Sequence, residues 1–305
     1  MLSVVIPTRN RREALIRTLR SLERQRRPDG DFEVVVADNG SGDGSPEAVR
    51  ELADRSSLAV RLVEEPRPGP AAARNRGVEE ARGDLILFLG DDTEAAGDDL
   101  IARHVELHEG GPDAGFAVLG LVTWSARQPV TPFMDWLERG GYQFAYGSLE
   151  DGRVSGTNAF WTAHVSLGRK LFERAGGFDE RFPYAAVEDI ELGARLERAG
   201  MVLEYHPELL VLHTHPTDLT ASLERLRRVG RSAALLHEID PGWDNPGLPR
   251  PGAVRSRLLR GSAPLWRGMA ALGKPRRLRD LAWKALHVSA YARGFSQGPP
   301  AGPAR

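Results

Sequence analysis

A chain of 305 residues with 41% hydrophobic residues and a net charge of −1 can hold one large α/β domain, or one domain with a helical appendage. The absence of cysteine excludes disulfides and thiolate metal sites, and no apolar run approaches the roughly 18 residues that cross a bilayer. The N-terminus, MLSVVIPTRN, enters a strand-like stretch at once and does not resemble a signal peptide, so we expect a cytoplasmic protein.

Four short apolar runs predict strands in the first hundred residues, at Ser3–Ile6, Phe32–Ala37, Val60–Val63 and Leu85–Leu89. Helices are expected between them, marked by Leu15, Leu19 and Leu22, by Ala48, Val49, Leu52 and Ala53, and by the segment Ala71–Ala81. Asn10 and Glu13 have the spacing of a capping box and would begin the first helix. This alternation is typical of a parallel sheet.

Three of the predicted strands are followed by a pair of polar residues: Thr8 and Arg9, Asp38 and Asn39, Asp91 and Asp92. In open parallel sheets, ligands bind beyond the C-terminal ends of the strands. A single Asp or Asn in a loop often only shapes a turn, but three such pairs on one sheet edge indicate a binding site.

The second half of the chain begins with a stretch, from Trp124 to Phe160, in which periodicity fades. Its aromatic residues are either core or the lining of a sugar or lipid acceptor site. The elements expected after it are helices near Ser166–Ala175 and Val187–Ala199, strands near Met201–Tyr205 and Leu209–His213, a helix marked by Leu219, Leu223, Leu226 and Val229, and basic amphipathic segments over Val254–Leu272 and Leu278–Phe295.

Positive charge gathers at the C-terminal end. Residues 250–305 contain twelve Lys or Arg residues and the single acid Asp280, so this segment carries about +11 and the remainder about −12. Such a balance favours an anionic membrane surface, a phosphorylated acceptor or docking on the acidic remainder of the chain. The apolar spacing of the last segment suits a membrane interface and a packed helix equally. Nucleic acid is not expected, because no base-reading motif accompanies the charge.

Asp91 and Asp92 follow an apolar strand, which would hold both carboxylates at the mouth of the sheet. Two carboxylates so close repel each other unless a cation lies near them. Mg²⁺ or Mn²⁺ bridging to a diphosphate meets this need, because such ions bind through a few carboxylates and substrate oxygens. The alternative is a helix cap, in which Asp92 or Thr93 starts a helix toward Leu100.

A second acidic pair, Glu188 and Asp189, falls in the first turn of a predicted helix, where the helix dipole favours the ionised form. An ionised carboxylate in a cleft can accept a proton from an attacking hydroxyl, although acids at helix starts are also common decoration. His213 and His215 lie at the end of a later strand, and one of them is a candidate metal ligand.

These residues lie in segments that resemble the family 2 glycosyltransferases. The similar segments cover roughly residues 3 to 215 in the family's order: VVIPTRNR (4–11), VVVADNGSGDGS (34–45), PGPAAARNRGVEEARGDLILFLGDDT (68–93), GGFDERF (176–182), EDIELGARLERAG (188–200) and VLHTH (211–215). The resemblance implies an α/β GT-A fold, Rossmann-like, with a mostly parallel central sheet flanked by helices. It divides the chain into a catalytic domain at 1–215, with a nucleotide-binding half at 1–93 and an acceptor and catalytic half at 94–215, and a basic helical extension at 216–305.

The resemblance also implies roles in donor binding. Pro7, Thr8 and Arg9 would line the nucleotide pocket. Asp38, with Asn39 beside it, would accept a hydrogen bond from the base, which in this family is often uracil. Arg74 would lie near the base or the phosphates.

Further matches concern the metal and the chemistry. Gly90 replaces the first acid of the family's Asp-X-Asp motif, which leaves Asp91 beside the nucleotide sugar and Asp92 as the metal-binding carboxylate. His213, with His215 as second choice, matches the metal-binding histidine. Asp189 matches the catalytic base, and Glu188 would orient the acceptor.

The activity implied is inverting transfer of a sugar from a UDP-, dTDP- or GDP-sugar to a hydroxyl, with Mn²⁺ or Mg²⁺ as cofactor. A glycan or lipid-linked acceptor of the cell envelope is expected, together with peripheral contact between the basic C-terminal helices and the inner face of the membrane.

Two other readings differ from this one. A sugar nucleotidyltransferase would also join an α/β sheet to a divalent ion, but it generally carries a Gly-rich phosphate loop near the N-terminus, where this chain has Pro-Thr-Arg-Asn. A catalytically weak glycosyltransferase-like binding protein is favoured by Gly90, and disfavoured by the presence of Asp92, Asp189 and His213 together.

Overall fold

The computed structural model describes residues 1–26, 31–111, 115–143, 145–150, 152–154, 159–245, 247–252, 263–271 and 275–300. Their strands form one sheet in the order β3-β2-β1-β4-β8-β6-β9-β5, with β7 pairing beside β9. Within these ranges β1, β2, β3, β4, β6 and β9 run in one direction, and β5, β7 and β8 run against them. The expected α/β architecture with a mostly parallel sheet is confirmed.

Residues 1–93, which the sequence predicted as a nucleotide-binding half, contain four neighbouring strands that pair parallel. These strands are β1 (Leu2–Thr8), β2 (Phe32–Asp38), β3 (Ala59–Glu64) and β4 (Leu85–Leu89), and the helices of this half are α1 (Arg12–Glu23), α2 (Ser45–Arg55) and α3 (Pro70–Glu80). The residues of β2 are all buried, as in a parallel sheet covered by helices on both faces. Their continuous apolar runs explain why these strands were predictable.

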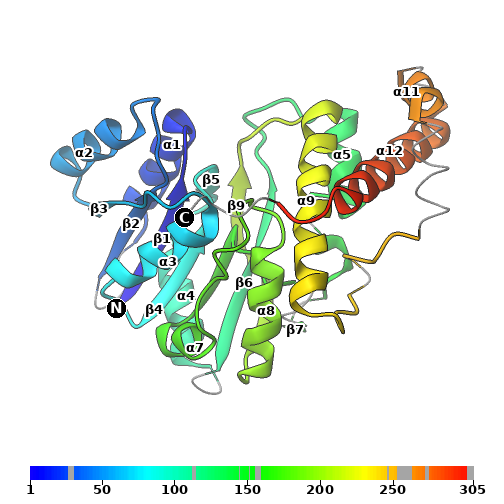
Figure 1. The fold of residues 1–305 in the computed structure, drawn as a ribbon. Coiled ribbons are helices and arrows are strands. Elements are labelled where there is room, and N and C mark those ends of the chain that lie inside the picture. Colours follow the sequence, from blue (N-terminus) through cyan, green and yellow to red (C-terminus); the bar gives the residue numbers. More distant parts are fainter. Residues whose placement is uncertain are drawn as a thin grey trace.

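The second half of the sheet is mixed. Its elements are β5 (Thr93–Ala95), α4 (Leu100–Glu109), β6 (Phe116–Trp124), α5 (Pro132–Arg139), the 3-10 turn η1 (Tyr146–Ser148), β7 (Gly152–Val154), β8 (His164–Gly168), α7 (Arg169–Arg174), α8 (Glu188–Arg198) and β9 (Val202–His213). Helices α9 (Leu219–Ile239), α11 (Ala263–Ala271) and α12 (Arg276–Ser296) lie beside α5, at the opposite end of the molecule from α2 (Figure 1).

The capping-box prediction is wrong. Helix α1 begins at Arg12, and its N-cap Arg11 makes no side-chain cap hydrogen bond. Asn10 adopts a left-handed backbone with φ of 54°, and its Oδ1 accepts a hydrogen bond at 2.7 Å from the backbone N–H of Gly42. The Asn10 side chain therefore ties the end of β1 to the loop after β2 and is not available to cap α1.

Three other elements differ from expectation. The helix toward Leu100 does not start at Asp92 or Thr93, because β5 pairs antiparallel with β9, with Thr93 opposite His213. Residues 164–168 form a strand between β4 and β6, so only Arg169–Arg174 of the predicted helix is helical. The two strands expected over 201–213 are one strand, β9, whose pairing with β6 shifts register between Gly120 and Leu121.

Most aromatic residues of the irregular stretch belong to the core. Trp124, Phe133, Trp136 and Tyr146 are buried in hydrophobic clusters. Tyr142 and Trp161 are only partly buried, and Phe144 lies outside the described residues.

The C-terminal helices pack closely on one another. A Cβ added to Gly294 of α12 would lie 2.0 Å from the backbone oxygen of Arg227 in α9, and one added to Gly230 would lie 2.1 Å from that of Tyr291. Of the expected segment Val254–Leu272, α11 covers 263–271, and the remainder lies outside the described residues. In the described parts of the chain, no helix is both long and apolar enough to cross a membrane.

Candidate active site

The acidic pair lies where β4 ends, next to the end of β1. Thr8, the last residue of β1, donates a hydrogen bond from Oγ1 to Asp91 Oδ2 at 2.8 Å. The Thr18 hydroxyl of α1 donates to the backbone oxygen of Asp91 at 3.1 Å. Parallel pairing of β1 with β4 thus brings Thr8 and Asp91 together, as the shared sheet edge predicted.

His213 is brought to Asp92 by the pairing of β5 with β9. Its Nε2 lies 3.3 Å from Asp92 Oδ2, and the backbone N–H of Thr214 donates to the Asp92 backbone oxygen at 2.9 Å. His215 is exposed, with its ring centroid 6.3 Å from that of His213. Of the three residues chosen from the sequence as metal ligands, Asp92 and His213 are therefore in contact.

The guanidinium of Arg11 faces both acids. Its Nη1 hydrogen-bonds to Asp92 Oδ2 and lies 3.6 Å from Asp91 Oδ1. Burial and the charge of Asp92 raise the pKa of Asp91 to about 7. Burial would also raise the pKa of Asp92, but His213 and Arg11 outweigh it and the pKa of Asp92 is lowered. One acid of the pair therefore stays ionised and attracts cations.

The second acidic pair is joined to α3 by a buried ion pair. Arg74 Nη1 donates to Glu188 Oε1 at 2.8 Å, and Glu188 Oε2 accepts from the backbone N–H groups of Ala186 and Val187 at 2.7 and 3.0 Å. Both carboxylate oxygens of Glu188 are thus engaged within the protein.

Asp189 differs from its neighbour. Its Oδ1 accepts a hydrogen bond from the backbone N–H of Ile190 at 2.9 Å, and the backbone of Thr162 also hydrogen-bonds to it. Burial and the charge of Glu188 raise the pKa of Asp189 to about 7, against the lowering effect of Arg74. A carboxylate with a pKa in this range can serve as a general base near neutral pH.

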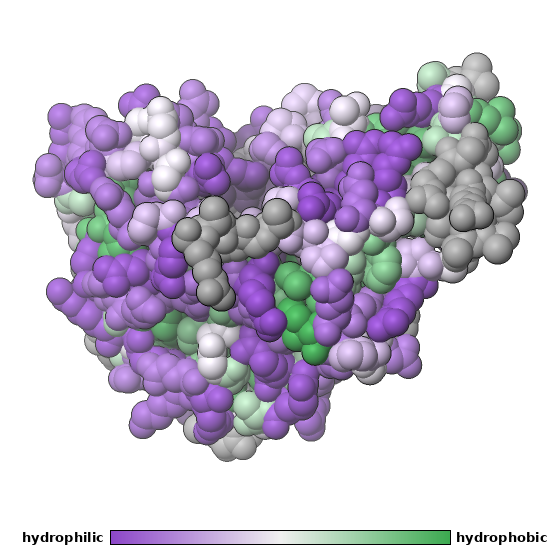
Figure 2. All heavy atoms as spheres, viewed as in Figure 1, coloured by the Kyte–Doolittle hydropathy of each residue, from purple (hydrophilic) through white to green (hydrophobic). Residues whose placement is uncertain are grey.

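The two acidic pairs share one edge of the sheet. Arg74 pairs with Glu188, and its charge also acts on Asp91 and Asp189. The backbone N–H of Gly90 donates to the oxygen of Ala163 at 3.2 Å, next to the Thr162 backbone that contacts Asp189. In Figure 2 the surface is indented at this edge, between the part over α1 and the part over α9.

The predicted base-binding residues lie at the end of β2. Asp38 Oδ2 accepts from the backbone N–H groups of Gly40 and Ser41 at 3.1 and 3.0 Å. Its Oδ1 is buried and has no hydrogen-bond partner among the residues that the structure describes. This oxygen can accept a hydrogen bond from an N–H group of a ligand.

Asn39 is engaged with the backbone instead. Its Nδ2 donates to the oxygens of Glu65 and Arg67 at 2.9 and 2.7 Å, and its Oδ1 accepts from the backbone N–H of Gly69 at 2.8 Å. Asn39 therefore holds the loop before α3 against the end of β2. Pro7 is partly buried and Arg9 exposed at the end of β1.

The donor atoms of Asp92 and His213 fit a divalent ion. Their separation of 3.3 Å suits two neighbouring ligands of an octahedral ion, which lie about 3 Å apart when each bond is about 2.1 Å. No group of three His, Asp or Glu side chains suited to a metal occurs within the described ranges. The other positions would go to diphosphate oxygens and water, as is usual for Mg²⁺.

Two arginines of this edge were not assigned from the sequence. Arg11 lies at the end of the segment VVIPTRNR. Its position shortly after β1 was the sequence feature that could have placed it in the site. Arg225 comes from α9, where its charge acts on Asp189 and Glu188 and its Nη1 approaches the backbone oxygen of Tyr142 at 3.4 Å. Its position depends on how α9 packs, which local sequence does not specify.

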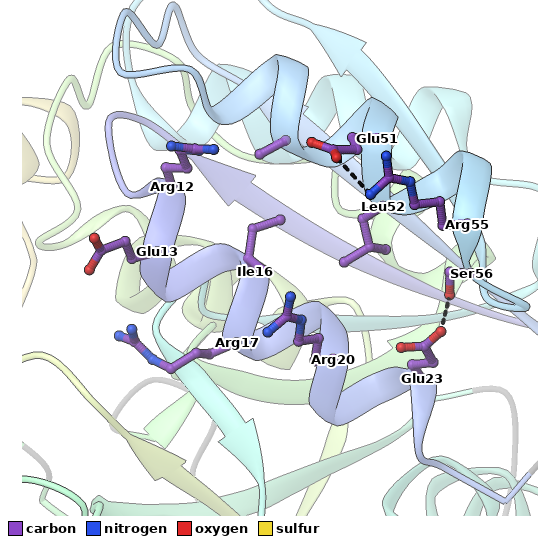
Figure 3. A pocket seen from close by; sticks show the side chains of 11 residues that line it. Arg12, Glu13, Ile16, Arg17, Arg20, Glu23, Glu51, Leu52, Arg55 and Ser56 are labelled. Carbon is purple, nitrogen blue, oxygen red and sulfur yellow. Dashed lines mark hydrogen bonds and ion pairs between the residues drawn. The ribbon is translucent and has the colours of Figure 1, made fainter.

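A cavity of about 550 Å³ lies between α1 and α2 (Figure 3). Some of its charged side chains pair with neighbours: Arg55 with Glu51 at 2.9 Å, and Glu23 with the Ser56 hydroxyl at 2.6 Å. None of the predicted site residues lines it, so we assign no chemistry to this cavity.

Two solved structures resemble the whole fold. The mannosyltransferase PcManGT from Pyrobaculum calidifontis, in complex with GDP-Man and Mn²⁺, has a TM-score of 0.67 and 22% identity, and the match covers 97% of this chain and 86% of that one. S. aureus TarS 1–349 in complex with UDP has a TM-score of 0.56 and 15% identity, with 97% and 90% covered. These likenesses confirm the GT-A fold.

Sequence comparison agrees. A validoxylamine A glucosyltransferase of Streptomyces hygroscopicus subsp. jinggangensis is 32% identical over 287 residues, which cover 85% of this chain and 67% of the relative. That of subsp. limoneus is also 32% identical, with 85% and 62% covered, and the uncharacterized glycosyltransferase YfnE of Bacillus subtilis is 29% identical, with 71% and 65% covered. The chain thus spans 62% to 67% of the length of these relatives. The family model described as glycosyl transferase family 2 matches residues 3–122, and the chain belongs to this family.

Proposed function

We propose that the chain is an inverting glycosyltransferase that moves a sugar from a nucleotide-diphosphate sugar to a hydroxyl group. The observation that carries this proposal is the shared sheet edge, where Asp92 contacts His213 and Arg74 links Asp91 to the Glu188–Asp189 pair. The names of relatives support it, since they include glucosyltransferases, and two solved neighbours hold GDP-Man and UDP. A UDP-, dTDP- or GDP-sugar is the proposed donor.

The donor's nucleotide would lie over the ends of β1 and β2. Asp38 Oδ1, buried and unpartnered in the described structure, would accept a hydrogen bond from the base. Thr8, Pro7 and Arg9 would line the pocket, with Asn39 holding its floor in place. Arg11 and Arg74 would offer positive charge to the diphosphate.

Asp92 and His213 would hold Mn²⁺ or Mg²⁺, with His215 close by. When bound there, such an ion offsets negative charge that builds on the departing diphosphate. Arg11 now pairs with Asp92, so its guanidinium would have to release that carboxylate on metal binding and could then contact a phosphate oxygen.

Asp189 would act as the general base. The acceptor hydroxyl passes its proton to Asp189 while its oxygen forms a bond to the anomeric carbon. The bond from that carbon to the diphosphate oxygen breaks, and the electron pair leaves with the nucleoside diphosphate. Attack from the face opposite the leaving group inverts the anomeric centre, and this outcome requires one base but no nucleophilic carboxylate.

Glu188 would position Asp189 and Arg74 without touching the acceptor, because both its oxygens are engaged. This refines the role expected from the resemblance, in which Glu188 orients the acceptor. Three residues are proposed to contact the acceptor: Arg225, whose charge acts on Asp189, Tyr142, whose backbone oxygen Arg225 approaches, and Trp161, which precedes Thr162.

The acceptor proposed is a cell-envelope glycan or lipid-linked saccharide met on the cytoplasmic side of the membrane. We propose the same division of the chain as before, with a catalytic domain at 1–215 and an extension at 216–305. The extension would shape acceptor binding, because Val229 and Tyr291 pack in one cluster with Phe182 and Val187, just before α8.

The direct test is release of nucleoside diphosphate from UDP-, dTDP- and GDP-sugars by the purified full chain with Mn²⁺. Slow hydrolysis of at least one donor, lost in EDTA, is expected. Pyrophosphate formed from a sugar phosphate and a nucleoside triphosphate would instead identify a nucleotidyltransferase. Binding of donors without any turnover would identify a binding protein.

The Asp189→Asn variant tests the base. We expect a loss of turnover of at least a thousandfold with donor affinity nearly unchanged, because the amide cannot accept the proton but has almost the same shape. The Asp179→Asn variant is a control outside the site. Equal turnover by Asp189→Asn and wild type would remove Asp189 from this role.

A further inference from the structure

The exposed large apolar side chains of the described residues concentrate on the C-terminal helices. Leu265 of α11 is 63% exposed, and Leu278 and Leu281 of α12 are 46% and 50% exposed. Met1 and Val130 are the other two in the described parts of the chain, and they lie before β1 and before α5, outside the C-terminal helices. Figure 2 shows apolar atoms at the outer end of the molecule, where Figure 1 places α11.

Helix α12 packs against α5 and α9 through residues on the side away from Leu278 and Leu281. Trp283 packs with Phe133 and Trp136 of α5, and Leu286 and Ala290 pack with Leu223 of α9. Of the apolar residues that the sequence assigned to one face of this helix, Ala285 and Ala292 are buried, whereas Leu278 and Leu281 are not. Packing against α5 and α9 therefore explains why the later apolar residues of this helix are buried. It leaves Leu278 and Leu281, in the first turns of α12, uncovered.

Basic side chains share the uncovered face. Arg277, Leu281 and Lys284 recur at spacings of four and three, which places them on one side of the helix, and all three are exposed. Helix α11 packs against α12 and has no acidic residue. Arg277 and Lys284 have no acidic partner within the described part of the chain.

We propose that this surface, formed by Leu265, Arg277, Leu278, Leu281 and Lys284, docks on an anionic lipid bilayer. Exposed leucines flanked by unpaired bases match an interfacial helix, whose apolar side chains enter the acyl boundary while its cations meet lipid phosphates. Charge complementarity selects this partner, because a second copy of the chain would bring like charges together at the same surface. The docking stands apart from the proposed sugar transfer and needs no turnover.

The experiment is flotation of the full-length protein with vesicles of phosphatidylcholine alone and with phosphatidylglycerol added. Binding to the mixed vesicles only, weakened by 0.5 M salt, is expected because screening removes the attraction between bases and phosphates. The Leu278→Gln/Leu281→Gln variant should bind roughly a hundredfold more weakly, since each inserted leucine is worth about tenfold. The Arg277→Glu/Lys284→Glu variant should lose roughly 25-fold or more, at about fivefold per base.

The matched control is Val130→Gln, which removes a 44% exposed apolar side chain from the segment before α5 and should float like wild type. Circular dichroism of each variant separates lost docking from lost folding. No flotation of wild type, equal binding to neutral vesicles, or wild-type binding by the leucine variant would each overturn the proposal. A lipid-free dimer that the leucine variant dissociates would also overturn it, because a second copy would then cover the leucines.

Discussion

At the scale of single residues, Asp189 and Glu188 show how neighbours in the sequence acquire different chemistry. Glu188 is buried between Arg74 and two backbone N–H groups, whereas Asp189 accepts hydrogen bonds from the backbone of Ile190 and Thr162 beside that charge. The contrast arises from α3 and the residues before β8, which the local sequence of α8 does not reveal.

The raised pKa of Asp189 predicts how transfer depends on pH. Because the folded pKa is about 7, the base is protonated below that value and ionised above it. With saturating donor and Mn²⁺, the rate should fall about tenfold per pH unit below pH 7 and level off above it. Arg74, Glu188, Arg225 and Tyr146 are the titratable or charged groups that act on this carboxylate. A rate that stays constant down to pH 5.5 would contradict the assignment.

Removal of the Asp92 carboxylate should affect metal-dependent binding only. We expect the Asp92→Ala variant to bind nucleoside diphosphate at least tenfold more weakly in Mn²⁺ and like wild type in EDTA, as calorimetry can measure. Asp98→Ala, which removes an exposed carboxylate near Arg26, is the control and should match wild type in both conditions. Unchanged affinity of Asp92→Ala in Mn²⁺ would show that the metal is held elsewhere.

At the scale of elements, the contact between α9 and α12 depends on the absence of two side chains. Gly294→Ala should favour the isolated helix by about 1 kcal/mol, yet its methyl group would meet the Arg227 backbone, so we expect net destabilisation of about 2 kcal/mol or more. Gly268→Ala in α11 is the matched control, because nothing lies within 4 Å of its added Cβ, and it should be neutral or stabilising. Denaturant midpoints that fall equally for both variants would show that the close approach is not what matters.

Elements built from local apolar runs were predictable, and those defined by distant partners were not. Strands β1 to β4 were predicted from continuous apolar segments. The position of Asp91 and Asp92 at the sheet edge was predicted from the end of the last of these segments. Strand β5 has three residues, and only its pairing with β9 makes it a strand. Residues 164–168 are strand because β4 and β6 flank them, although Ser166 and Leu167 precede a helix in the sequence without a break.

At the scale of the whole molecule, a buried histidine cluster links stability to pH. His104 Nε2 lies 3.0 Å from His164 Nε2, and the Ser166 hydroxyl contacts both His104 and His108. Burial lowers the pKa of His108 and of His164 to about 4 and that of His104 well below its usual range. Gly120 makes the room, since a Cβ there would lie 2.0 Å from the His164 ring.

The sign of this linkage follows from protons taken up on unfolding. The unfolded histidines bind protons below about pH 6.5 while the folded ones stay neutral, so stability is greatest above pH 6.5 and falls as the pH drops toward 4. His164 alone should cost about 1.5–2 kcal/mol between pH 6.5 and 5. The denaturant midpoint of His164→Asn should therefore change less over this range than that of wild type. Identical slopes for the two proteins would refute the linkage.

Strand β8 lies between β4 and β6, although it follows both in the chain. During synthesis, the apolar edge of Leu85–Leu89 therefore emerges long before the strand that covers it. An uncovered apolar strand is a template for pairing with other chains, so the nascent protein is most prone to aggregate in this interval. The C-terminal half of the sheet, through β8, thus also protects the N-terminal half from self-association. We expect the nascent chain to need chaperones until β8 has paired with β4.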